Sequence, residues 1–293
     1  MFKHYSLKPI KADNYIEDLL TILKSTFKQK LESIILFGSL AEGYFSEDVS
    51  DVDIIVVLSD DSSKEDIKKS REIIKNIEIK YNFSQKTDSF RGRLLKFFDE
   101  QTGMFVSYFV CKKSDLIQGN FNKIFLRSPI FFLIADIAVP KKIVLTNVFG
   151  RASIVYGNNV LQEIKIPIIG IIDIIKDFIM NFCLSLFAIS IYPFSDKATK
   201  YSMEARKWSF INCHTFLHKQ STNLAETYEY YIQNKFTIDY IERMMQLRKK
   251  YEKNANFVLK TPLCILVVHF IAFLCRPHPH FKPCPKQEQC KYD

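Results

Sequence analysis

The stretch that decides the fold is residues 36–53, Leu-Phe-Gly-Ser-Leu-Ala-Glu-Gly-Tyr-Phe-Ser-Glu-Asp-Val-Ser-Asp-Val-Asp. It begins inside a short apolar run, residues 33–37, whose composition is typical of a buried strand. Gly38 permits backbone angles that other residues avoid, and Ser39 suits the N-cap of a short helical turn that Gly43 ends. Free backbone N–H groups at such a turn form an anion site. The sequence therefore predicts that Gly38 and Ser39 bind a phosphate group.

Two carboxylates open the next apolar run, residues 51–58. Side chains along a strand alternate between its faces, so Asp51 and Asp53 are expected on the same side. Two carboxylates on one face need a counter-charge. Mg²⁺, or Mn²⁺ in its place, takes such oxygen ligands together with the phosphates of a substrate. A metal ion there would hold a triphosphate for in-line attack, so Asp51 and Asp53 are the predicted metal ligands and catalytic residues.

Neither a Gly-Ser turn nor an Asp-x-Asp pair carries this conclusion alone, but their combination resembles a known signature. It is similar to that of the DNA polymerase β-type nucleotidyltransferase superfamily, and closest to its minimal and kanamycin nucleotidyltransferase-like members. The resemblance covers about residues 15–112, and residues 40–43 lack two arginines that the family often has. The matching positions are Gly38, Ser39, Gly43, Ser50, Asp51 and Asp53.

This resemblance implies both a fold and an activity. The fold is an α/β (α+β) domain with a small mixed sheet, followed by an all-α helical-bundle domain. The activity is transfer of a nucleoside monophosphate from a nucleoside triphosphate to an acceptor hydroxyl, with release of pyrophosphate. ATP is the favoured triphosphate. The acceptor is a small molecule, a protein or an RNA end, and no motif in the sequence selects among them.

The family also implies a third carboxylate on a later strand, and here the sequence departs from the pattern. The candidate strand is residues 103–110, in which Ser107 stands where an Asp is expected. The resemblance to kanamycin nucleotidyltransferase-like enzymes implies a catalytic glutamate from the helical domain, and Glu204 is the candidate in this sequence. The alternative for Glu204 is an ordinary solvated helix residue. Two other functions stay open, a nucleotide-binding protein that has lost catalysis and an antitoxin-like interaction protein.

The length of 293 residues favours two domains rather than one. Residues 1–157 are expected to form the nucleotidyltransferase domain, and residues 158–275 the helical domain. The helices are predicted at about 166–191, 197–219, 223–234 and 237–259. Residues 276–293 are expected to be a disordered tail. The candidate zinc ligands in this tail are His278, His280, Cys284 and Cys290. Zinc binding is not favoured, because their spacing fits no standard zinc site.

Charge and hydropathy limit the partners and the location. The formal net charge of +9 favours polyanionic partners such as nucleotides. The start of the sequence lacks an apolar leader and the seven cysteines suit a reducing compartment, so a cytoplasmic location is expected. Two apolar stretches, residues 166–193 and 263–275, are interrupted or short for a membrane span and are predicted as buried core helices. No membrane association is expected, and a homodimer is left open.

Overall fold

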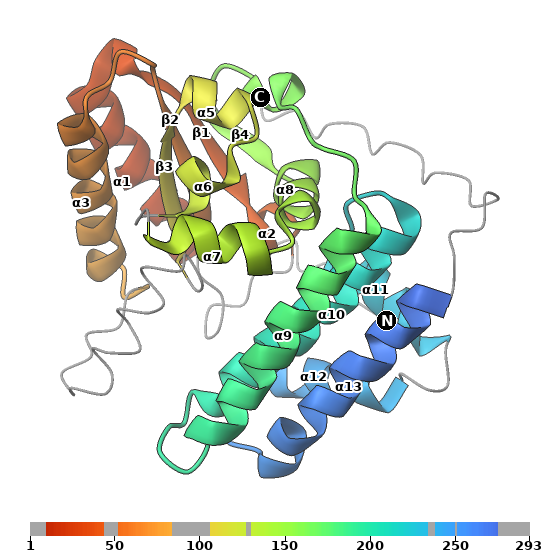
Figure 1. Ribbon diagram of the computed structural model, residues 1–293. Helices are drawn as coiled ribbons and strands as arrows, with labels where there is room; N and C mark the ends of the chain where they lie inside the picture. Colours follow the sequence, from red (N-terminus) through yellow and green to blue (C-terminus); the bar gives the residue numbers. More distant parts are fainter. Residues whose placement is uncertain are drawn as a thin grey trace.

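The computed structural model describes residues 10–43, 52–83, 106–126, 130–233, 238–249 and 251–274. Within these ranges the chain forms a sheet covered by helices, and then a region made of helices (Figure 1). Asp51 and Ser50 lie outside the described residues, as does the predicted tail with its histidines and cysteines.

The sheet has four strands in the order β3-β2-β1-β4. Strand β1 pairs antiparallel with both β2 and β4, whereas β2 and β3 are parallel, so the sheet is mixed as the sequence predicts. The strands are β1 Leu31–Phe37, β2 Asp53–Leu58, β3 Tyr108–Lys112 and β4 Ser153–Gly157.

Helices lie on both faces of the sheet (Figure 1), and alternation of side chains along the strands creates a core on each face. Ile54 and Val56 of β2 face the helices α1 and α3, while Ile55 and Val57 face the helices α5 to α8. The helices of this sheet region are α1 Ile10–Phe27, α2 Gly38–Ala41, α3 Lys64–Lys80, α5 Lys113–Ile117, α6 Phe121–Phe125, α7 Ile130–Ala138 and α8 Lys141–Gly150.

The starts of the first two long helices carry acidic side chains. Asp13 lies in the first turn of α1. Helix α3 is capped by Ser63, and the neighbouring Ser62 is buried. The Ser63 hydroxyl accepts a hydrogen bond from the Asp66 N–H at 3.0 Å, and the Asp66 carboxylate accepts one from the Ser63 N–H at 2.8 Å. This capping box satisfies two N–H groups that the helix itself leaves unpaired.

The helical region follows β4 and a short 3₁₀ turn, Val160–Glu163. The predicted helix over 237–259 is two helices, because the Asn254 side chain accepts a hydrogen bond from the Phe257 N–H at 2.8 Å and starts a new one. Helices α9, α10 and α13 pack against one another. The region consists of α9 Ile171–Ile191, α10 Ala198–His218, α11 Leu224–Ile232, α12 Ile238–Lys249 and α13 Ala255–Leu274.

The two long apolar helices, α9 and α13, are only partly buried, which corrects the prediction of buried core helices. By length and composition alone both could cross a membrane. Helix α9 turns polar side chains inward, and Asp177 there accepts hydrogen bonds from Asn212 at 2.6 Å and from the Asn181 amide at 2.9 Å. Because these polar groups find partners in the core, several isoleucines of α9, such as Ile172, Ile175 and Ile179, are left on the outside.

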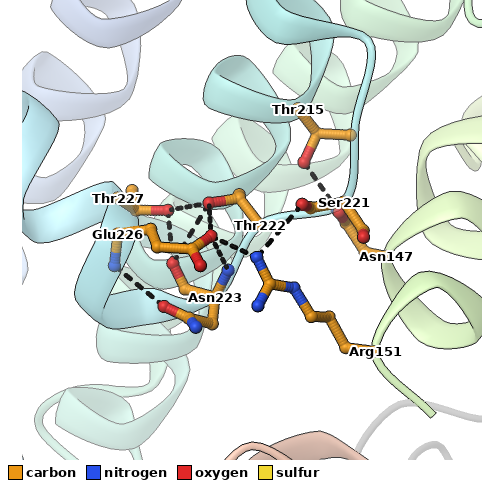
Figure 2. A network of polar contacts seen from close by, with 8 residues as sticks. All are labelled: Asn147, Arg151, Thr215, Ser221, Thr222, Asn223, Glu226 and Thr227. Carbon is orange, nitrogen blue, oxygen red and sulfur yellow. Dashed lines mark hydrogen bonds and ion pairs between the residues drawn. The ribbon is translucent and has the colours of Figure 1, made fainter. Parts of the chain in front are cut away.

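A polar network joins the last helix of the sheet region to the helical region (Figure 2). Asn147 of α8 accepts a hydrogen bond from Thr215 of α10 at 2.7 Å, and Arg151 forms an ion pair with Glu226 of α11. A Cβ on Gly150 would lie 2.2 Å from the Ser221 hydroxyl, so only glycine permits this approach. The network fixes α10 and α11 relative to the sheet.

Candidate active site

The Gly-Ser turn and the start of β2 lie side by side at one edge of the sheet. Phe37 at the end of β1 pairs with Asp53 at the start of β2. Gly38 follows with φ +70°, and a Cβ on it would lie 2.2 Å from Oδ2 of Asp53. The Asp53 carboxylate therefore lies directly over the main chain of the turn. Two residues that the sequence predicts to act together are in contact in the structure.

The turn itself differs in one detail from its prediction. Helix α2 begins at Gly38 with Phe37 as its N-cap, so Ser39 lies inside the helix and does not cap it. The Glu42 N–H donates to the Gly38 carbonyl at 3.1 Å and closes the single turn. Gly43, with φ +76°, then ends the helix as predicted.

Asp53 has the chemistry expected of a ligand for a divalent metal. Its side chain is partly buried, and its Oδ2 faces the space that the missing side chain of Gly38 leaves. Carboxylate oxygens are the donors that Mg²⁺ takes, together with substrate phosphates. Asp53 therefore fits the metal that the resemblance implies. Asp51, its predicted partner, lies outside the described residues and stays a prediction.

Ser107, the position of the expected third acid, contacts a carboxylate from another element. The Ser107 carbonyl accepts a hydrogen bond from the Ile54 N–H at 2.8 Å, which places Ser107 beside Asp53. Its hydroxyl donates to Oε1 of Glu78 in α3. Glu78 is buried, and its spacing of four residues from buried Ile74 places both side chains on the same face of α3. The sequence reasoning missed Glu78 because it sought an acid within the strand.

Glu204, the predicted base, is held by two cations. Its carboxylate pairs with Lys207 one turn along α10 and with Arg248 of α12 at 3.7 Å. Burial raises the pKa of Glu204, but Lys207 and Arg248 outweigh this effect and lower it below the ordinary value. Glu204 is therefore held ionised. Its assignment as the base stays a prediction.

Charged groups of both regions act on Glu42 at the end of α2. Burial raises the pKa of Glu42 to about 7, although Arg151, Lys207 and Arg248 are close enough to act against this rise. Three cations thus influence the ionisation of Glu42, at the end of the turn that starts at Gly38. They belong to distant parts of the chain, so no sequence motif connects them.

Glu42→Gln is expected to reduce the pH dependence of the unfolding free energy. The folded chain keeps the Glu42 proton up to a pKa of about 7, against 4.5 ordinarily, so between these values the folded state binds more protons. Stability therefore falls as pH rises through this window, by up to about 3 kcal/mol, and the variant lacks this loss. Urea unfolding of the native chain and the variant at pH 4.5 to 8 measures this pH-dependent loss of unfolding free energy. The control is Glu65→Gln on the exposed side of α3, and identical pH profiles for both variants would contradict the assignment.

Comparison with known proteins identifies the class of domain that this chain contains. Residues 16–99 match the family model of the nucleotidyltransferase domain, so this chain contains such a domain. The fold is also similar to that of spectinomycin adenyltransferase AAD(9) from Enterococcus faecialis, crystallised with ATP and spectinomycin. The TM-score is 0.53 at 15% sequence identity, and the alignment covers 89% of this chain and 99% of that chain. A search of curated proteins finds no match. The predicted superfamily and fold class are confirmed.

Proposed function

We propose that this protein is a metal-dependent nucleotidyltransferase that moves a nucleoside monophosphate, with ATP as the favoured donor, to an acceptor hydroxyl. The observation that carries the proposal is the Asp53 carboxylate lying over the Gly38 main chain. The family model over residues 16–99 and the fold shared with an adenyltransferase support it.

In the proposed reaction the acceptor oxygen attacks the α-phosphorus, the bond between the α- and β-phosphates breaks, and pyrophosphate leaves. Asp53 and the predicted Asp51 would hold Mg²⁺, which neutralises charge on the phosphate oxygens when bound. Gly38 lets the phosphates approach the main chain because it has no side chain. Catalysis would then come from positioning and charge neutralisation.

The cations that act on Glu42 at the end of α2 support a polyanionic substrate. Lys207 and Arg248 are both oriented by Glu204, and Arg151 is held by Glu226. Positive charge at this place would balance the triphosphate and then the departing pyrophosphate. The acceptor proton passes to a carboxylate, for which Glu204 is the sequence candidate and Glu78, through Ser107, is the alternative that the structure supplies.

The test is to incubate the full chain with Mg²⁺, a cell extract and each of the four labelled ribonucleoside triphosphates in turn. The expected result is a labelled acceptor with stoichiometric pyrophosphate, and neither product in the presence of EDTA. Glu204→Gln should keep Mg²⁺-dependent ATP binding and lose transfer if Glu204 is the base. ATP binding without any transfer by the native chain indicates a nucleotide-binding protein instead. No ATP binding at all favours the antitoxin-like interaction protein.

A further inference from the structure

The outer surface of the helical region carries apolar side chains in a regular pattern. On α13 the exposed residues follow a spacing of four and three positions, the heptad spacing of helices that pack along a seam. They are Leu259, Leu263, Leu266, Phe270 and Phe273. Phe270 is 59% exposed and Leu266 is 48% exposed. Helix α13 thus presents a packing seam to solvent.

Helix α9 shows the same spacing beside it. Its outward apolar residues are Ile172, Ile175, Ile179, Phe182 and Leu186, of which Phe182 is half-buried. The structure describes every residue of α9 and α13. All exposed residues of α9 are uncharged, and Lys260 is the one charged residue among the exposed residues of α13. We call the outward faces of α9 and α13 the outer face.

The two stripes lie next to each other. Asp177 of α9 contacts His269 of α13 at 2.9 Å, and Ala188 packs with Val258 towards the other end. The helices are therefore antiparallel, and Ile179 stands level with Leu266 across them. Figure 1 shows α9 and α13 running along the same side of the helical region. The outer face is one continuous apolar surface.

The size of the outer face matches that of a stable protein interface. At about 200 Å² per large apolar side chain, its exposed fractions add up to on the order of 1,000 Å². A standard stable interface takes about 800 Å² from each partner, and monomeric proteins rarely expose so large an apolar patch.

We propose that the outer face binds a second copy of this chain in a two-fold homodimer. A two-fold axis through the outer face would set each helix against α9 or α13 of the partner in antiparallel fashion, as in a four-helix bundle. Only another uncharged apolar surface complements this one. A membrane fits less well, because α9 and α13 pack on α10 from behind and Lys176, the one basic residue of α9, donates a hydrogen bond to the Asp136 carbonyl.

Sedimentation equilibrium of the full chain at micromolar concentration tests the proposal. The native chain should be a dimer, and Ile179→Lys or Leu266→Lys should raise the dimer dissociation constant at least about 100-fold, because each buries a charge in the seam. The milder Leu263→Gln should act in the same direction. Ile22→Lys, at an α1 side chain that is 39% exposed, is the matched control and should stay dimeric.

Circular dichroism of each variant must match that of the native chain, since the substituted side chains are on the surface. A native chain that is monomeric, or outer-face variants that dimerise as the native chain does, would overturn the proposal. Flotation with phosphatidylserine vesicles tests the competing proposal that the outer face binds a membrane. Vesicle binding by a monomeric native chain, lost in Leu266→Lys, would assign the outer face to a lipid surface instead.

Discussion

Asp53→Asn is expected to lower the rate of nucleotide transfer about 10³-fold or more, which is the scale of losing a charge that acts on the transferring phosphate. The substitution keeps the shape of the side chain but removes the negative charge beside Gly38. Pyrophosphate release at saturating ATP and Mg²⁺ measures the effect, and thermal unfolding should be almost unchanged.

The matched control is Asp61→Asn, in the turn at the opposite end of β2, where the carboxylate accepts a hydrogen bond from the Ser59 hydroxyl. It should keep full activity. Gly38→Ala is a second probe, because its Cβ would occupy the position of the Asp53 oxygen and its φ of +70° disfavours any side chain. Full activity in Asp53→Asn would refute the metal-ligand assignment.

Asp177→Asn is expected to lower the unfolding free energy by about 3 to 5 kcal/mol, the usual loss when one partner of a buried ion pair is removed. The side chains of Asp177 and His269 are almost wholly inaccessible to solvent. Nδ1 of His269 lies 2.8 Å from the Ile265 carbonyl and Nε2 lies 2.9 Å from the Asp177 carboxylate, so both ring nitrogens have acceptors. The imidazole is therefore doubly protonated.

The electrostatics of the pair agree with this geometry. Burial alone lowers the pKa of His269, but neighbouring Cys213 and Asp177 outweigh it and raise the pKa to about 11. Urea unfolding at neutral pH measures the loss, and Asp196→Asn, at an exposed carboxylate paired with Lys253, should cost at most about 1 kcal/mol. The double variant with His269→Met should recover part of the loss, because no charge is left unpaired. Simple addition of the two single losses would contradict the ion pair.

The sequence predicted best where the deciding residues are neighbours in the chain. Gly38 and Asp53 are fifteen positions apart on two adjacent strands, so the motif fixes their contact through strand pairing alone. Glu78 could not be placed in this way, because its contact with Ser107 depends on how α3 crosses the sheet. Lys207 and Arg248 likewise meet only after α10 and α12 pack.

The orientation of α9 shows a second limit of sequence reasoning. Helical periodicity defines two faces, and the usual rule buries the apolar one. Here Asp177 and Asn181 form hydrogen bonds within the core, so the buried face is the polar one. The domain division near Gly157, the cytoplasmic location and the role of Asp51 stay predictions.

The network at Gly150 has a consequence for how substrates would enter. Since Asn147 and Arg151 connect α8 to α10 and α11, these helices are held relative to the sheet before any ligand arrives. A preorganised site loses little conformational entropy on binding. We therefore expect nucleotide binding to follow simple one-step kinetics, with an association rate limited by diffusion and charge rather than by hinge closure.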